Sequence, residues 1–176
     1  MKTIAVLVGS LRKNSYNRKL FQVCNRQAPD ELRFIDVPVA LPLFNEENED
    51  PFPPEVVAFR KALQESDGIL IISPEYNRSI PGGLKNAIDW ASRADNVFSG
   101  KRVATAGVTV GRLGTAPMQQ HLRSILVYFN THVMGQPELQ LAGAATLFDD
   151  TGAVTDKRTA ESIQKYLAAL GEFFGH

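Results

Sequence analysis

Continuous apolar runs alternate with amphipathic segments along the whole chain. Runs of apolar residues, or strict apolar–polar alternation, predict strands over 3–8, 32–37, 68–73, 101–108 and 132–141. Apolar residues at helical spacing predict helices over 15–27, 55–66, 82–93, 117–129 and 156–174. The last strand is the weakest, because Gly135 and Pro137 interrupt it. Strands alternating with helices predict one doubly wound α/β domain, with a parallel sheet covered on both faces.

This organisation also predicts where a ligand binds. In doubly wound sheets, ligands bind beyond the carboxyl ends of the strands, where the strand order reverses. The loops after the first, third and fourth predicted strands are GSLRKNSYN (9–17), SPEYNRSIPGG (73–83) and TVGRLGTA (109–116). They are also the stretches with the most unusual composition, so we expect the functional site there.

The first loop carries a cluster of hydrogen-bond donors immediately before a predicted helix. Backbone N–H groups at a helix N-terminus are unpaired and the helix dipole is positive there, so an anion is stabilised. The hydroxyls of Ser10 and Ser15, the Asn17 amide and the Arg12 guanidinium add further donors. This set suits a terminal phosphate monoester. The alternative, helix capping alone, accounts for one of these residues rather than four.

Other nucleotide motifs are absent or incomplete. Gly9 lacks the second and third glycines of G-x-G-x-x-G, and G-x-x-x-x-G-K-[ST] does not occur. Asp36 holds the position of a ribose-binding acid at the end of the second strand, but the missing glycines disfavour that role. In the second loop, an aromatic beside amides, followed by Gly82 and Gly83, suits a flat heteroaromatic ring.

Together, GSLRKNSYN and PEYNRSIPGGLKNAIDW resemble the NADPH-dependent FMN reductase family of flavodoxin-like proteins. The branch that the chain resembles most contains chromate and quinone reductases and azoreductase-type members. The resemblance continues through GKRVATAGV and HLRSILVYF to the final helix. It implies a single FMN-binding domain over residues 1–176, a flavodoxin-like three-layer sandwich whose five-stranded parallel sheet has the order 2-1-3-4-5.

The same resemblance implies the residues that bind FMN. The first loop would bind the phosphate with Ser10, Arg12, Ser15, Tyr16 and Asn17. The second would line the isoalloxazine with Pro74, Glu75, Tyr76, Asn77 and Ser79. The third would close the far side of the ring with Thr109, Val110 and Gly111, although TVGRLG departs from the Ser-rich version common in relatives and leaves only backbone contacts as expected there.

Two arginines have no fixed role in this scheme. Arg78 stands where family members often have Tyr or Gly. It either binds the extra phosphate of NADPH or is a solvated surface side chain. Arg112 is a second candidate for the same phosphate.

The implied activity is a ping-pong reaction. A hydride passes from NADPH or NADH to bound FMN, and then to a quinone or a similar acceptor such as chromate, an azo compound or free flavin. This chemistry requires no acid–base side chain, so no catalytic residue is predicted, and Glu75 is interpreted as a structural hydrogen-bond acceptor. The alternatives are a non-catalytic flavodoxin-type electron carrier, which the neutral charge disfavours, and a nucleotide-binding regulator.

Composition narrows the partners and the location. Nineteen basic residues balance nineteen acidic ones without basic runs, which disfavours nucleic acid. No segment approaches the roughly 20 apolar residues that span a bilayer, and MKTIAVLVGS lacks the features of a signal peptide. The single cysteine, Cys24, lies on an apolar stripe and predicts a buried thiol in a reducing cytoplasm. His121, His132 and His176 lack metal-ligand spacing, so no metal is expected.

Two helices carry apolar residues away from their sheet-facing stripes. These residues are Trp90 in 82–93, and Val127 and Tyr128 in 117–129. They predict a homodimer or homotetramer that buries Trp90 and Tyr128 at interfaces formed by both helices, the alternative being stray surface aromatics. The Pro-rich, acidic segment 38–55 is interpreted either as a rim or lid or as a solvated loop.

Overall fold

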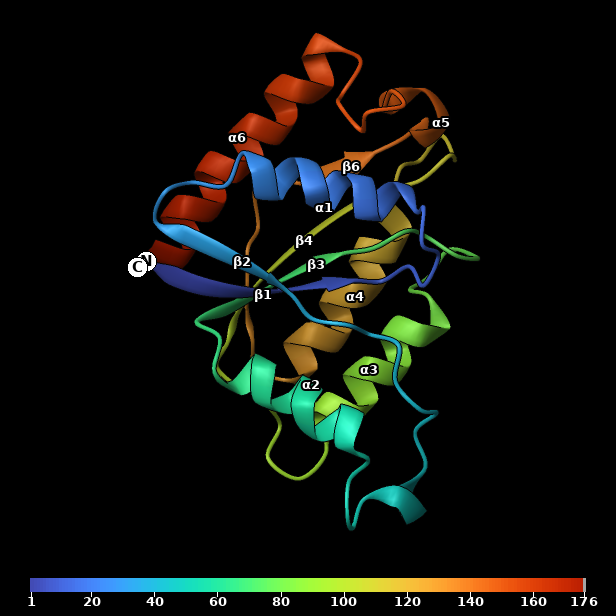
Figure 1. The fold of residues 1–176 in the computed structure, drawn as a ribbon, viewed down its shortest axis with the longest axis vertical. Coiled ribbons are helices and arrows are strands. Elements are labelled where there is room, and N and C mark those ends of the chain that lie inside the picture. The colour runs from blue at the N-terminus through green and yellow to red at the C-terminus, as the bar shows by residue number, and fades with distance from the viewer. Residues whose placement is uncertain (176) are drawn as a thin grey trace.

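A central parallel sheet separates two layers of helices in the computed structural model, which describes residues 1–175 (Figure 1). The strands are β1 (Lys2–Val8), β2 (Leu32–Asp36), β3 (Gly68–Ile72), β4 (Arg102–Val108), β5 (His132–Val133) and β6 (Leu139–Leu141). The order across the sheet is β2-β1-β3-β4-β5, and β6 also pairs with β4. This order confirms the predicted flavodoxin-like fold.

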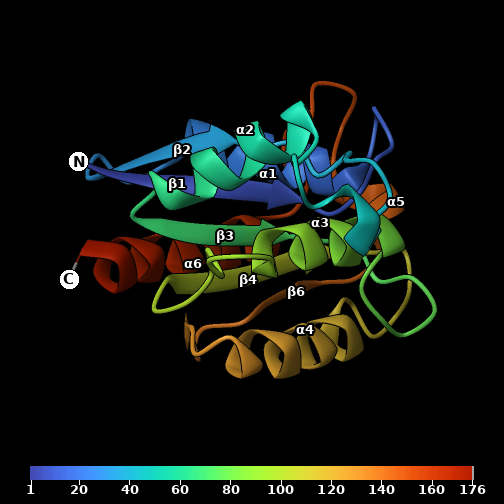
Figure 2. The same ribbon diagram turned by 90° about the horizontal axis from the view of Figure 1, so that it is seen from below.

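The two faces of the sheet carry separate hydrophobic cores. Alternate residues of β1 point to opposite faces, so Ile4 and Val6 enter one core while Ala5 and Leu7 enter the other. Helices α1 (Tyr16–Arg26) and α6 (Lys157–Gly175) cover the first core; α2 (Pro54–Gln64), α3 (Gly82–Ser92) and α4 (Ala116–Tyr128) cover the second. Figure 2 shows α2, α3 and α4 in front of the sheet and α1 and α6 behind it. No helix in this described part of the chain is both long and apolar enough to cross a membrane.

The last predicted strand is two short strands. β5 and β6 pair in parallel with the first and second halves of β4, and the segment between them contains the Gly135 and Pro137 that interrupt the pattern. The sheet therefore has six strands. The four-residue helix α5 (Ala144–Leu147) and the 3-10 helix η1 (Glu46–Asn48) were not predicted, because elements this short show no periodicity.

The burial of Trp90 corrects the prediction that a partner subunit covers it. The side chain has no exposed surface within the single chain. Segment 38–55 covers it instead: the indole N–H donates to the Pro42 carbonyl at 2.8 Å, and the Phe44 ring packs edge-on at 4.9 Å between centroids. Glu49 also pairs with Arg93 at 2.7 Å. The segment therefore packs on α3 through these contacts, while most of its other residues are exposed.

Close approach of the backbone brings the three predicted site loops together. A Cβ on Gly9, after β1, would lie 2.4 Å from the Ser73 hydroxyl, and one on Gly107, in β4, would lie 2.2 Å from the Ser73 carbonyl oxygen. Only glycine permits these contacts. The carboxyl ends of β1, β3 and β4 are thus packed tightly on Ser73.

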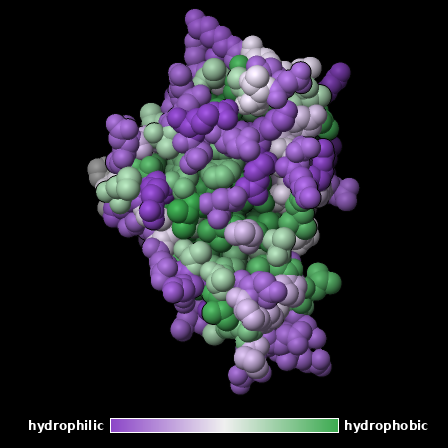
Figure 3. Space-filling view, viewed as in Figure 1, coloured by the Kyte–Doolittle hydropathy of each residue, from purple (hydrophilic) through white to green (hydrophobic). Residues whose placement is uncertain are grey.

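An apolar hollow lies apart from these loops, between β2 and α2. It has a volume of about 380 Å³, and its walls include Ile35, Val37, Ala58 and Phe59. Figure 3 shows hydrophobic surface gathered on this face between more polar regions. Since none of the predicted site residues lines this hollow, we assign it no part in the candidate site.

Candidate functional site

The first and second loops share one hollow at the carboxyl edge of the sheet. That edge of the sheet lies on the right in Figure 2. It has a volume of about 290 Å³ and is lined by Gly9, Leu11, Arg12, Tyr76, Pro81, Gly82 and Gly83. A second hollow of about 440 Å³ continues from Arg12 along the start of α1. A tail bound at α1 and a ring bound near Tyr76 would therefore occupy neighbouring spaces.

The start of α1 is both capped and open to an anion. Ser15 is the N-cap, and its hydroxyl accepts the Arg18 N–H at 3.0 Å. The Ser10 hydroxyl accepts the Arg12 N–H at 3.4 Å. The Tyr16 and Asn17 N–H groups have no acceptor among the described residues. The two interpretations of this loop are thus compatible: one donor is capped, while two backbone N–H groups and the serine hydroxyls remain available to a phosphate.

Asn17 has a structural task that its position in the motif did not predict. Its side chain is 2% exposed, donates to the Val108 carbonyl at 2.9 Å and accepts the Val108 N–H at 3.0 Å. The amide therefore ties the first turn of α1 to the end of β4. What Asn17 offers an anion is its backbone N–H, rather than the side-chain amide that the sequence indicated.

The second loop contains a two-residue hairpin. Tyr76 and Ser79 exchange backbone hydrogen bonds, each 3.0 Å long, around Asn77 and Arg78. Both central residues have positive φ, 50° and 66°, as in a type I′ turn. Asparagine tolerates this conformation, whereas arginine is unusual there. Tyr76 is 46% exposed, and it borders the hollow shared with the first loop.

Glu75 is a structural acceptor, as predicted. Its carboxylate accepts the Met118 N–H at 3.1 Å, in the first turn of α4. A carboxylate at this end of a helix also favours the helix dipole. Pro74 is buried directly before it, and its carbonyl accepts the Ser73 hydroxyl at 3.1 Å.

The third loop has fewer free backbone groups for a ligand than the sequence indicated. The Thr109 N–H donates to the Leu141 carbonyl at 3.0 Å, and its own carbonyl accepts the Ala144 N–H at 3.1 Å. The backbone of Thr109 is thus already engaged by β6 and α5. Val110 and Gly111 are exposed, and their N–H groups lack partners within residues 1–175.

Two residues near the site were not predicted. His121 in α4 shares a hydrogen bond of 2.6 Å with the Ser79 hydroxyl. Asp150 lines the hollow at α1 together with the basic residues of the first loop. His121 was judged only for metal spacing, and Asp150 lies far from every motif, so only the folded chain reveals either contact.

Two other reactive groups, the Cys24 thiol and the Asp36 carboxylate, have structural roles. Cys24 is fully buried, as predicted, and this burial raises the pKa of its thiol to about 12. Asp36 pairs with Arg18 at 2.5 Å, so its carboxylate is already occupied. Among the residues that the structure describes, no cluster of three or more His, Cys, Asp or Glu side chains is arranged to hold a metal ion.

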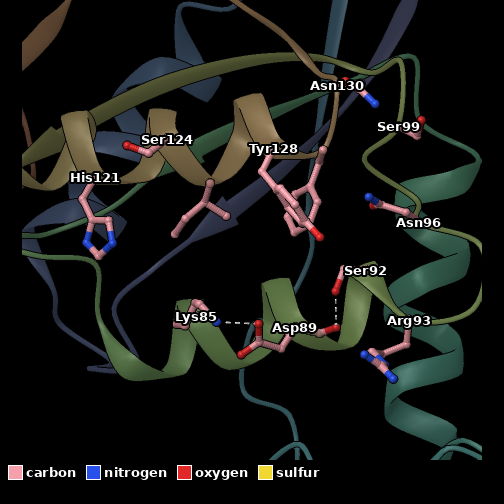
Figure 4. A pocket seen from close by; sticks show the side chains of 12 residues that line it. Lys85, Asp89, Ser92, Arg93, Asn96, Ser99, His121, Ser124, Tyr128 and Asn130 are labelled. Carbon is pink, nitrogen blue, oxygen red and sulfur yellow. Dashed lines mark hydrogen bonds and ion pairs between the residues drawn. The ribbon is translucent and has the colours of Figure 1, made fainter.

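A further hollow, about 780 Å³ in volume, is a groove between α3 and α4 (Figure 4). Lys85 and Asp89 form an ion pair at 2.6 Å on its α3 side, and His121 and Tyr128 stand on its α4 side. None of the residues that line this groove belongs to the predicted site, but one of them, His121, bonds Ser79 of the second loop.

Known proteins are similar to this chain in sequence. The family model "NADPH-dependent FMN reductase" matches residues 2–146. A quinone reductase of Pseudomonas putida is 44% identical over 159 residues, covering 88% of this chain and 86% of that one. A 2-hydroxy-1,4-benzoquinone reductase of a Burkholderia species is 40% identical over 167 residues, covering 93% and 91%.

A solved structure is similar over nearly the whole chain. It is a flavoenzyme NAD(P)H:(acceptor) oxidoreductase of Paracoccus denitrificans, with a TM-score of 0.92 and 38% identity, covering 99% of this chain and 98% of that one. The chain belongs to the NADPH-dependent FMN reductase family, and it is an oxidoreductase that works with FMN and NAD(P)H.

Proposed function

We propose that the protein is an FMN-dependent NAD(P)H:quinone oxidoreductase with a ping-pong mechanism. The observation that carries the proposal is the open N-terminus of α1 beside the hollow at Tyr76, on one edge of the sheet. The names of the most similar relatives, which are quinone reductases, support a quinone as acceptor. Chromate, azo compounds and free flavin are proposed as further acceptors, because an exposed reduced flavin transfers electrons to many oxidants.

The residues present fit FMN. Free N–H groups of Tyr16 and Asn17, the hydroxyls of Ser10 and Ser15, and exposed Arg12 supply donors to a phosphate dianion. Segment 74–79 would line the ring on one side, and the N–H groups of Val110 and Gly111 would meet it on another. When bound, FMN supplies the hydride chemistry, while the protein supplies position and electrostatics.

The protein's own contribution is orientation. The first loop would fix the phosphate tail of FMN, which would place the ring at the carboxyl edge with one face open to solvent. NAD(P)H and the acceptor would use that face in turn. The one carboxylate in the second loop, Glu75, already accepts the Met118 N–H at the start of α4.

A two-step anaerobic experiment tests the proposal. FMN-loaded protein is first mixed with NADPH or NADH, and the loss of absorbance at the flavin band is followed. After removal of the nucleotide, a quinone is added and the band should return in one two-electron step. The same reoxidation is then compared for chromate, an azo dye and free flavin. A flavodoxin-type carrier would not be reduced by NAD(P)H alone, and that result would overturn the proposal.

We propose that Arg78 selects NADPH. It is exposed at the apex of the hairpin, in a left-handed conformation that arginine rarely adopts. A cation there can meet the extra phosphate of NADPH at the mouth of the site. Arg78→Ala should raise KM for NADPH about tenfold while leaving KM for NADH unchanged. Arg112→Ala is the matched control, and a larger effect there would transfer the role to Arg112.

We propose a homodimer or homotetramer that uses the surface of α3 and α4. The prediction rests now on Tyr128, which is 81% exposed, and on its exposed neighbour Val127, beside the groove of Figure 4. Light scattering at micromolar concentration should give a multiple of 19.4 kDa. Tyr128→Asp should lower that mass, and a monomeric wild-type protein would refute the proposal.

We propose the cytoplasm as the place of action. The single cysteine is buried as a thiol, so the fold requires no disulfide. NAD(P)H, the reductant, is a cytoplasmic metabolite. Fractionation of cells with an antibody to the protein tests this directly.

A further inference from the structure

We propose that His121 is a positioning residue of the flavin site: it clamps the hairpin 76–79 to α4 through Ser79. The inference rests on the proposed function, since it assigns the hairpin to the wall of the ring site. It adds to that function a residue outside the three loops.

The hairpin needs support from outside. It holds itself with two backbone hydrogen bonds between Tyr76 and Ser79. The strain of two successive residues with positive φ, one of them arginine, opposes the stabilisation that these two hydrogen bonds provide. Tyr76, Asn77 and Arg78 are all exposed, so burial contributes little to holding them. An isolated two-stranded hairpin of this kind is marginally stable in water.

Two side-chain hydrogen bonds supply that support, and both end on α4. The Glu75 carboxylate accepts the Met118 N–H at 3.1 Å, before the hairpin. The Ser79 hydroxyl and His121 Nδ1 lie 2.6 Å apart, at its far end. Met118 and His121 are three residues apart, in the first two turns of the helix. The hairpin is therefore fastened to α4 at both ends.

This geometry makes α4 a link between two walls of the site. The helix begins at Ala116, directly after the third loop, so the third loop and the hairpin are attached to the same turns of α4. Loss of the His121 bond would free one end of the hairpin while the Glu75 bond remained. A small displacement of a wall beside the reacting atoms lowers the rate of hydride transfer much more than it lowers cofactor binding.

The surroundings of His121 leave Ser79 as its partner. Figure 4 shows the imidazole on the α4 side of the groove, with Lys85 and Asp89 on the α3 side. Those two side chains pair with each other at 2.6 Å. No ion pair of His121 with a carboxylate occurs among residues 1–175, so the hydroxyl of Ser79 is the group that fixes its ring.

The test compares His121→Ala with His121→Asn, in which the amide takes the place of Nδ1, and with Ser79→Ala. Ser124→Ala is the matched control, since Ser124 lines the same groove one turn further along α4 and bonds within its own helix. Amide hydrogen exchange of Tyr76 and Ser79 is measured in the FMN-free protein. FMN affinity and the anaerobic rate of flavin reduction by NADPH are measured in the loaded protein.

We expect His121→Ala and Ser79→Ala each to speed exchange at Tyr76 and Ser79 about tenfold and to slow flavin reduction about tenfold. FMN affinity should change less than threefold, because the first loop holds the tail. The double variant should be no worse than either single one, and His121→Asn should restore most of both readouts.

The inference is wrong if His121→Ala behaves like Ser124→Ala in exchange and in reduction rate, or if His121→Asn is as impaired as His121→Ala. If His121→Ala does not fold, Ser79→Ala and His121→Asn still decide the question. Failure of the wild-type protein to bind FMN would instead refute the proposed function, while the exchange measurement would still report on the clamp.

Discussion

The first loop and the hairpin of the second loop are neighbours at the carboxyl edge, but different interactions hold them. In the first loop, Ser15 and Asn17 are buried, and their side chains bond the backbone of α1 and β4. The hairpin is exposed, has two residues with positive φ, and is fastened to α4 by bonds at its two ends. The first loop is therefore part of the core, whereas the hairpin is attached to the core by these bonds.

This difference matches two separate demands on a flavin site. The charged tail needs fixed donors, because preorganised N–H groups bind an anion without further ordering. The ring needs a wall that admits two different substrates in turn. A hairpin held by a few side-chain bonds can shift by small amounts without disturbing the core. We therefore expect substitutions in the first loop to affect stability and cofactor binding, and substitutions around the hairpin to affect turnover.

The largest effect is expected at Asn17. Asn17→Ala leaves the N–H and carbonyl of Val108 buried without partners, and the two together should cost about 3 kcal/mol of unfolding free energy. Urea unfolding of the FMN-free protein measures it. Asn14→Ala, an exposed residue of the same loop, is the control. A loss at Asn17 no larger than at Asn14 would mean that the first loop is not part of the core.

Next in size is the effect of Arg12→Ala on FMN affinity. Removal of a cation from the phosphate site should weaken FMN binding about thirtyfold, or about 2 kcal/mol, with little change in stability because Arg12 is exposed. Fluorescence titration at two salt concentrations measures it. Lys13→Ala removes an equal charge from the same loop and should weaken binding less, since lysine lacks the bidentate geometry. Equal losses of FMN affinity in the two variants would indicate that only the overall positive charge of the loop matters.

The carboxylate of Glu75 provides the third test. Glu75→Ala removes the acceptor at the start of α4 and should cost about 1 kcal/mol. Glu75→Gln keeps an acceptor and should recover about half of it, since the charge is lost from the helix terminus. Thermal unfolding measures both. If Glu75→Gln abolishes flavin reduction while stability is kept, the carboxylate has a chemical role and the structural interpretation fails.

Periodicity predicted the fold well, because strands buried on both faces and amphipathic helices leave clear patterns in the sequence. The run at 68–72 is buried at every position, as its composition indicates. Periodicity did not predict elements that are very short, such as α5. It also did not predict where a long irregular segment packs on a helix of the same chain. Trp90 shows the second case: its position away from the sheet-facing stripe correctly predicted a second packed surface, but segment 38–55 of the same chain supplies that surface.

The candidate site was predicted as three loops, but not as a set of contacts. Motifs indicate which residues approach a ligand; they do not show which of those side chains the fold already uses. Asn17 and Thr109 belong to the predicted set, yet Val108, Leu141 and Ala144 engage them. His121 lies 42 residues from Ser79 and has no spacing that reveals the contact. Such a contact depends on how α4 packs against the hairpin, and no local sequence pattern predicts that packing.

The smallest expected effect has the opposite sign and concerns Arg78. Arg78→Gly removes the strain of a side chain with φ of 66°, and it should stabilise the protein by about 0.5 kcal/mol after the entropy of glycine in the unfolded chain is deducted. Asn77→Gly should gain less, because asparagine tolerates this conformation. Urea unfolding of both variants measures the difference. A loss of stability in Arg78→Gly would show that the arginine side chain braces the hairpin, which would then be held by more than its two bonds to α4.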